Sequence, residues 1–419
     1  MSLKIRLIVM NFLQFAVWGA YLTSMGSCLV TANMSSKIGL FYAMQGIVSL
    51  FMPALIGIIA DRWVPAQKML GICHGLAAIF IFAAGSYGLS AGGDVEFNRL
   101  FTLYSLSVLF YMPTIALSNS VAYSALESAG MDTIKEFPSI RIFGTIGFIC
   151  AMLIVDATGF QYNFSQFIFS AAIGITLALY SFTLPKCKVN RSKETKSFVE
   201  AMGLDAFALF KDKRMATFFI FSMLLGVSLQ ITNGFANPFI TSFKDIPMYA
   251  DTFGANHANA LISLSQISET LCILLIPFFL RKFGIKKVML IAMVAWVFRF
   301  GLFGAGNPGN GVWMFILSMI VYGVAFDFFN ISGSLFVNEA TDESIRSSAQ
   351  GLFMLMTNGF GATIGTLGAQ FVVNKLVYSQ SDIASQISGW SSAWYIFAGY
   401  ALIVAILFAV IFKYEHEQT

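Results

Sequence analysis

The sequence is poor in charged residues. Asp, Glu, Lys and Arg make up only 11% of its 419 residues, whereas 57% are hydrophobic and the mean hydropathy is +0.76. Because a soluble domain carries roughly 25% charged residues, this composition excludes a water-soluble protein.

Clusters typical of metal and disulfide sites are also lacking. The three histidines form no HExxH-like pair, and no CxxC spacing occurs among the five cysteines, which are Cys28, Cys73, Cys150, Cys187 and Cys272. Neither a disulfide framework nor a metalloenzyme is therefore indicated. We expect no metal, no cofactor and no enzymatic activity.

Long apolar segments fill the chain instead. Segments of about 20 residues are long enough to cross a hydrocarbon core, and only helices and closed barrels satisfy their backbone groups there. The run of residues 7–30 follows Lys4 and Arg6, but it is too long for a cleaved signal and reads as the first membrane helix. Charged and Gly/Pro/Asn-rich breaks predict twelve helices near 7–30, 38–60, 69–91, 97–122, 138–159, 164–184, 214–243, 257–281, 286–305, 310–336, 345–376 and 391–413. The sequence thus predicts an all-α membrane protein with two six-helix halves, 1–184 and 214–419, joined by a polar linker, 185–213.

The basic residues predict which side of each helix is inside. With a cytoplasmic N-terminus, 19 of the 25 Lys and Arg residues fall on the cytoplasmic side and four on the other. This bias predicts that both termini and the basic linker are cytoplasmic. Because membrane topology explains the net charge of +4, no nucleic-acid partner is needed.

The two halves echo each other. GIIADRWVPAQK follows the second predicted helix, and FFLRKFGIKK follows the eighth, so a charged turn occupies the matching place in each half. Such an echo indicates a duplicated unit, an arrangement in which substrates bind near the membrane midplane where the repeats meet. The turn with Gly57, Asp61 and Arg62 resembles the cytoplasmic loop signature of the major facilitator superfamily, which implies that fold and a gating role for this loop.

Asp327 is the most unexpected residue, because it is the only charge between Arg299 and Glu339. A charge at the centre of a membrane helix costs at least about 2.5 kcal/mol, so it normally faces a cavity or a partner. A structural ion pair with a neighbouring helix is the alternative to a functional role. Tyr322 and Phe326 lie at helical spacing before it; they either pack the core or offer a flat ring a stacking surface.

Other polar groups fall inside predicted helices. Glu269 has Gln266 one turn before it, and a glutamate that reaches water is the alternative to a functional pair. Arg141 has Thr145 and Phe148 on the same helical face, although an arginine near a helix end is often topological. Gln230 and Asn233 form an amide pair near Gly234 and Pro238, which allow bending. For three further groups we expect structural roles: interhelical hydrogen bonds for Gln14 and Asn358, and snorkelling or pairing for Arg299.

Together, these residues suit the transport of a neutral solute. Many donors and acceptors with few fixed charges match a hydroxyl-rich or heterocyclic compound. A carboxylate in an apolar setting can hold a proton at accessible pH, which would couple binding to protonation.

Several long motifs then resemble one branch of the major facilitator superfamily, the bacterial nucleoside–proton symporters. They run through nearly the whole chain and include FPSIRIFGTIGFI, FFIFSMLLGVSLQITN, SQISETL, SMIVYGVAFDFFNISGS and SAQGLFMLMTNGFG. The resemblance implies import of nucleosides with protons by alternating access across the inner membrane of a bacterium. We expect a monomer embedded in the lipid bilayer. It implies proton coupling through Asp327 or Glu269 and a nucleoside site formed by Arg141, Thr145, Phe148, Gln230, Asn233, Gln266, Glu269, Tyr322, Phe326 and Asp327.

Two alternatives stay open at this point. A proton-coupled sugar or disaccharide symporter would share the fold and could use a similar set of charges. A membrane-embedded enzyme or a sensor would need a nucleophile–base pair, a metal cluster or an added soluble domain, and the sequence has none of these.

Overall fold

The computed structural model describes residues 2–187 and 204–414, and within them not the side chains of 61, 62, 134, 204, 205, 343, 344 and 347. The described residues are mostly helical and contain no strand. They form two compact units. The first comprises residues 1–35 and 47–202, and the second comprises 36–46 and 203–419.

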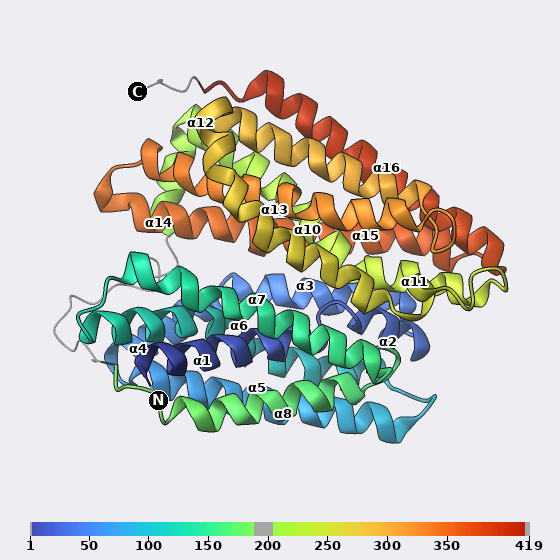
Figure 1. The fold of residues 1–419 in the computed structure, drawn as a ribbon, viewed down its shortest axis with the longest axis horizontal. Coiled ribbons are helices and arrows are strands. Elements are labelled where there is room, and N and C mark those ends of the chain that lie inside the picture. The colour runs from blue at the N-terminus through green and yellow to red at the C-terminus, as the bar shows by residue number, and fades with distance from the viewer. Residues whose placement is uncertain (1, 188–203, 415–419) are drawn as a thin grey trace. The chain divides into compact units, whose positions relative to one another are not determined.

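The first unit is a helical bundle (Figure 1). Its elements are α1 (Leu3–Gly19), α2 (Met25–Thr31), the end of α3 (Ile38–Ser49), α4 (Met52–Arg62), α5 (Ala66–Ala91), α6 (Phe97–Ser128), α7 (Thr133–Ala157), η2 (Phe160–Tyr162) and α8 (Ser165–Ser181). In this unit α5 packs against α6 and α8, while α1 packs against α7.

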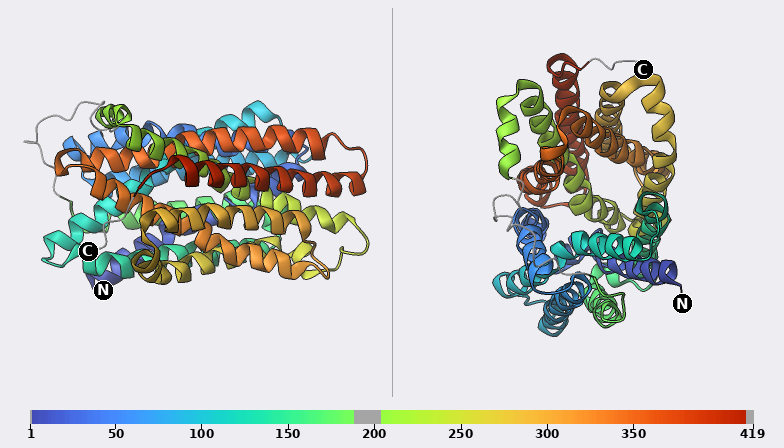
Figure 2. Two further views of the ribbon diagram at one scale, coloured as in Figure 1. Left: turned by 90° about the horizontal axis from the view of Figure 1, so that it is seen from above. Right: turned by 90° about the vertical axis from the view of Figure 1, so that its left-hand side faces the viewer.

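The second unit is also a bundle, seen end-on in Figure 2. Its elements are η1 (Ser35–Lys37) with the start of α3, η3 (Leu204–Lys211), α10 (Lys213–Ser242), η4 (Phe243–Asp245), α11 (Phe253–Asn256), α12 (Ala258–Ala305), α13 (Val312–Ala340), α14 (Glu343–Met354), the π-helical η5 (Leu355–Gly361), α15 (Ala362–Val373), the π-helical η6 (Asn374–Tyr378) and α16 (Ile383–Ile411). Aromatic rings from α10, α12 and α16 fill much of its core; Trp394 lies 4.8 Å from Phe303 and 5.5 Å from Phe239 between ring centroids.

Eight helices of the described chain are long and apolar enough to cross a membrane, or nine if α3 and α4, bent by 41°, form one span. The predicted boundary between residues 281 and 286 corresponds to a break inside α12, where Gly284 adopts a φ of 74°. A left-handed conformation suits glycine, so this residue lets the chain turn between two apolar segments. Two of the expected helices, α1 and α8, contain only 17 residues each.

The segment predicted as a gating loop is largely helical. The helix α4 includes Gly57, Asp61 and Arg62 and ends at Arg62, two residues beyond the predicted helix end at residue 60. A Cβ atom added at Gly57 would meet nothing within 4 Å, so this glycine is not required by a close contact. The side chains of Asp61 and Arg62 lie outside the described residues, and their predicted gating role stays a prediction.

Helices in each unit touch backbone to backbone at glycines. In the first unit a Cβ atom at Gly147 would overlap the Phe12 carbonyl oxygen, and one at Gly19 would overlap that of Phe148, so α1 and α7 meet closely. In the second unit Gly226 of α10 lies in the same way on the Thr357 carbonyl of η5. Small residues permit such an approach between membrane helices, where dispersion contacts drive association.

Replacing Gly147 with alanine should therefore destabilise the protein. The added methyl group has no room, so α1 and α7 must separate, and overpacking of this kind costs typically about 1 to 3 kcal/mol. The check is the melting temperature of purified protein in detergent. Gly301→Ala is the matched control, because a Cβ there meets nothing within 4 Å; equal melting temperatures for the two variants would contradict the close contact.

Candidate functional site

Three of the predicted site residues share one face of α7 in the first unit. Arg141 lies eight positions after Thr133, the first residue of α7, and its guanidinium sits over the ring of Phe15, with 3.9 Å between Cζ and the ring centroid. A cation over an aromatic face is stabilised by the ring quadrupole. Thr145 is half-buried on the next turn. The predicted grouping of these side chains on one helical face is therefore present.

Phe148 completes that face and contacts α1. Its ring lies 6.4 Å from that of Trp18 in an edge-on arrangement, and its exposed fraction is 7%. The Trp18 indole nitrogen is buried and has no hydrogen-bond partner among the described residues. The sequence analysis missed Trp18. Its place one helical turn after Gln14 was the available signal.

Gln14 forms the interhelical hydrogen bonds that the sequence predicted. Its Nε2 donates to Oγ1 of Thr114 on α6 over 2.8 Å, and its Oε1 lies 2.7 Å from Nε2 of His74 on α5. Since a carbonyl oxygen only accepts, Nε2 of His74 carries the proton of this bond. The Tyr111 hydroxyl donates to the backbone carbonyl oxygen of Gln14 over 2.9 Å. One side chain thus connects three helices of the first unit.

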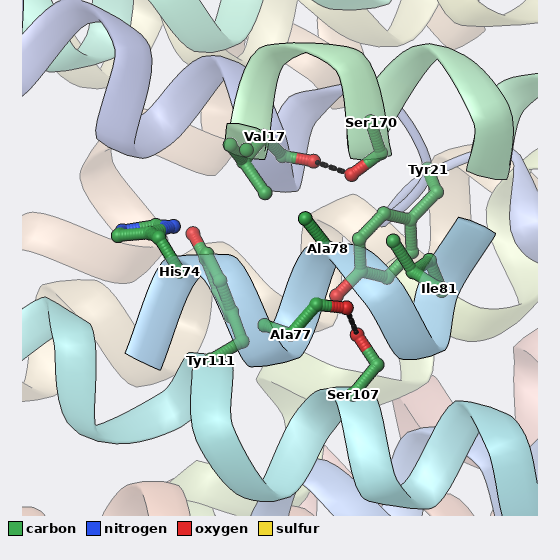
Figure 3. A pocket seen from close by; sticks show the side chains of 10 residues that line it. Val17, Tyr21, His74, Ala77, Ala78, Ile81, Ser107, Tyr111 and Ser170 are labelled. Atoms are coloured by element: carbon green, nitrogen blue, oxygen red, sulfur yellow. Dashed lines mark hydrogen bonds between the residues drawn. The ribbon is translucent and has the colours of Figure 1, made fainter. Parts of the chain in front are cut away.

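A small cavity lies beside this network in the first unit (Figure 3). His74 and Tyr111 contribute to its lining together with Tyr21, Ser107 and Ser170. Both serine hydroxyls are already engaged, Ser107 donating to Ala77 over 2.8 Å and Ser170 to Val17 over 2.7 Å. The serines therefore hold helices together.

In the second unit, α12 and α13 bring five predicted residues together. Gly323 of α13 packs on the backbone of Ser268 in α12, where a Cβ atom added at the glycine would lie 2.6 Å from the Ser268 carbonyl carbon. This approach places Gln266 and Glu269 of α12 beside the α13 stretch that carries the other three. Tyr322 lies within electrostatic reach of Glu269 and within hydrogen-bonding reach of Gln266.

Asp327 is buried, with an exposed fraction of 5%. Its Oδ2 atom has no hydrogen-bond partner within the described parts of the chain, and the carboxylate of Glu269 acts on it electrostatically. The predicted alternative, a structural ion pair, finds no support, because no cation among the described side chains pairs with Asp327. Two neighbouring carboxylates in an apolar site cannot both be ionised without a large cost.

The rings of Tyr322 and Phe326 are nearly parallel. Their planes differ by 4° and their centroids are 5.8 Å apart. Phe326 is only half-buried, whereas Tyr322 is 4% exposed. The two rings are therefore stacked on each other, as core packing also requires, and a surface on which a flat ring stacks stays a prediction.

The amide pair lies on α10. Asn233 donates from Nδ2 to Oε1 of Gln230 over 3.1 Å, so the two side chains orient each other. The ring of Tyr42, from the start of α3, lies against Gly234 in the same unit, 3.3 Å from a Cβ placed there. Tyr42 therefore adjoins the amide pair, and no spacing in the sequence indicated it.

The structural expectation for Asn358 is wrong, and for Arg299 one of the two expected alternatives is excluded. Asn358 contacts Sδ of Met354 one turn earlier over 3.9 Å, so within the described chain it pairs inside its own helical segment and not with another helix. Arg299 does not snorkel, because its exposed fraction is 1%. The expected alternative, pairing, is confirmed, although its partners are a carbonyl oxygen and aromatic rings.

The fold defines a class of protein. The structure of a D-xylose–proton symporter aligns with a TM-score of 0.68 at 14% identity, covering 98% of each chain, a likeness that shows the fold alone. Together with the apolar helices of the described chain, it shows the fold of a multi-pass membrane protein, of the kind that this symporter has.

Closer similarities give the family. A model of the nucleoside H+ symporter family matches residues 1–417. The chain is 47% identical to the nucleoside permease NupG of Escherichia coli over 421 residues, covering 100% of this chain and 98% of that protein. It is 45% identical to the xanthosine permease of the same organism over 420 residues, covering 100% and 97%. A NupG crystal structure aligns with a TM-score of 0.90 at 46% identity, covering 99% and 100%. The chain belongs to the nucleoside H+ symporter family.

The hydrogen-bond network around Gln14 predicts a stability effect. Gln14→Met keeps the side-chain volume but leaves His74 and Thr114 without their shared partner, and an unsatisfied buried polar group costs about 1 to 3 kcal/mol. We expect a lower melting temperature in detergent. Gln386→Met is the control, because that side chain bonds the Gln380 carbonyl at an exposed position; a drop as large in the control would remove the network from the explanation.

Proposed function

We propose that this protein imports nucleosides together with protons by alternating access. Membership of the nucleoside H+ symporter family over residues 1–417 carries this proposal. Asp327 supports proton coupling: its Oδ2 has no hydrogen-bond partner among the described residues, and protonation would relieve its repulsion with the carboxylate of Glu269.

The proposed nucleoside-binding residues are found in each unit, and each group is described by itself. The parallel rings of Tyr322 and Phe326 suit a flat base, which stacks on aromatic faces. Gln230, Asn233 and Gln266 offer donors and acceptors for the base or the ribose hydroxyls. In the first unit, Arg141, Thr145 and Phe148 provide a donor-rich face with an aromatic residue at its end.

The membrane arrangement is part of the proposal. Twelve spans would form two six-helix pseudo-repeats, 1–184 and 214–419, with a cytoplasmic linker at 185–213 and both termini inside. The glycine contacts support the duplication, because α1 meets α7 in the first unit, and α10 meets η5 in the second, at the first and fifth spans of each proposed repeat. We further propose that the transporter acts as a monomer in the bacterial inner membrane.

Proton coupling is tested by replacing the two carboxylates. Asp327→Asn and Glu269→Gln remove the ionisable group with little change in volume, so each should abolish accumulation against a gradient if its residue carries the proton. The measurement is uptake of labelled uridine into proteoliposomes with and without an imposed proton gradient. Gradient-driven accumulation by both variants would exclude both residues. Accumulation by the unaltered protein without any gradient would contradict symport.

A competition assay tests the substrate class. Unlabelled nucleosides should reduce uridine uptake, whereas ribose and lactose should leave it unchanged, because neither sugar carries the planar base that is proposed to stack on Tyr322 and Phe326. Inhibition by the sugars at the concentrations where nucleosides act would favour the alternative of a sugar symporter.

A further inference from the structure

Arg299 is a buried cation whose partners are not acidic. It lies on the second part of α12, and it makes no ion pair with any residue in the described ranges. Its Nη1 donates to the carbonyl oxygen of Ser318 over 2.8 Å, and Oγ of Ser265 is 3.4 Å from the same nitrogen. Two polar contacts compensate a buried charge poorly, so a reason for its presence must lie in its other neighbours.

Those neighbours are aromatic. The guanidinium carbon lies 4.5 Å from the ring centroid of Tyr322 and 5.1 Å from that of Phe303. Trp296 meets Tyr322 edge-on with 5.9 Å between centroids and an angle of 90°. The ring of Tyr322 is therefore held by a cation at its face and by an indole at right angles to it. A desolvated cation–π contact is among the stronger interactions that can fix a ring.

We propose that Arg299 is a positioning residue for nucleoside binding, which it supports by holding the Tyr322 ring parallel to Phe326. This inference rests on the proposed function, because it assigns Arg299 to the stacking surface of that site. Arg299 itself need not touch the nucleoside.

The chemistry favours arginine over lysine at this position. A planar guanidinium can lie flat on a ring while its edge donates to the Ser318 carbonyl, whereas a lysine ammonium is a point charge with stronger hydration. Arginine also keeps its charge at neutral pH. The Tyr322 ring thus keeps one orientation while the nearby carboxylates change their protonation.

The test measures uridine uptake kinetics for Arg299→Lys and Arg299→Met in proteoliposomes. With Tyr322 loosened, KM should rise about tenfold in Arg299→Met, as expected for loss of a desolvated cation–π contact. Arg299→Lys should rescue part of the affinity. The maximal rate per folded transporter should change far less than KM, because the proton-coupling carboxylates are untouched.

Arg99→Met is the matched control. Arg99 lies over the ring of Tyr87 with 4.4 Å to the centroid, but this pair belongs to the first unit and contains no proposed site residue. Its KM should stay that of the unaltered protein. An increase as large as in Arg299→Met would overturn the assignment.

A double-mutant cycle separates positioning from a general structural role. If Arg299 acts through the ring, Arg299→Met should add little to the KM already raised by Tyr322→Leu. Additive effects, an unchanged KM in Arg299→Met, or failure of both Arg299 variants to fold while Tyr322→Leu folds would each overturn the proposal. If the unaltered protein takes up no nucleoside, the proposed function fails instead, and this outcome is distinct.

Discussion

The cost of placing charge among apolar helices governs the second unit. Asp327 and Arg299 are each at least nine-tenths covered by protein, and Glu269 is half-buried. A fold that solely maximised stability would replace them with apolar side chains, because a buried charge is repaid only by close partners. Instead, α12 and α13 pack closely at Gly323, and this contact brings the two carboxylates and the arginine near one another. The carboxylates and the arginine all act on the same aromatic residue, Tyr322.

The first unit solves a different problem with neutral groups. Three of its buried polar residues form a chain of hydrogen bonds, in which His74 donates to Gln14 and Gln14 donates to Thr114. Such a chain ties α1, α5 and α6 together without a charge. Arg141 stands apart from it over the ring of Phe15. The two units therefore carry unlike chemistry on similar helical frameworks: a mostly neutral network in one, and a charged, protonatable cluster in the other.

The sequence predicts those features of the structure that depend on local residue pattern. Apolar length and charged breaks located most helices to within a few residues, since those features follow from bilayer thickness. They also selected Asp327 and Glu269, because a charge in an apolar run is conspicuous without any knowledge of contacts. The pairing of Gln14 across helices could be anticipated for the same reason, as a lone amide in such a run needs a partner.

What escaped prediction depends on three-dimensional proximity. Trp18 and Tyr42 read as ordinary apolar positions. Only the packing of α1 on α7, and the contact of the Tyr42 ring with Gly234 of α10, give them a place near the polar groups. Arg299 was expected towards the outer end of its helix, and nothing in the pattern reveals that a carbonyl oxygen and two rings surround it. The prediction of an interhelical hydrogen bond for Asn358 was wrong, because its side-chain amide contacts the thioether of Met354 one turn earlier in the same helical segment.

Backbone contacts at the glycines also have a mechanical meaning. Where a backbone carbonyl of one helix packs directly against a glycine of its neighbour, the two helices interlock. Neither helix can then slide along the other unless the two first separate. Shear of one helix past its neighbour, a common way for packed helices to rearrange, is therefore blocked within the pairs α1 with α7 and α10 with η5. The two helices of each pair should therefore move together as one rigid body. Any bending during a transport cycle would then occur in helices without such glycine contacts.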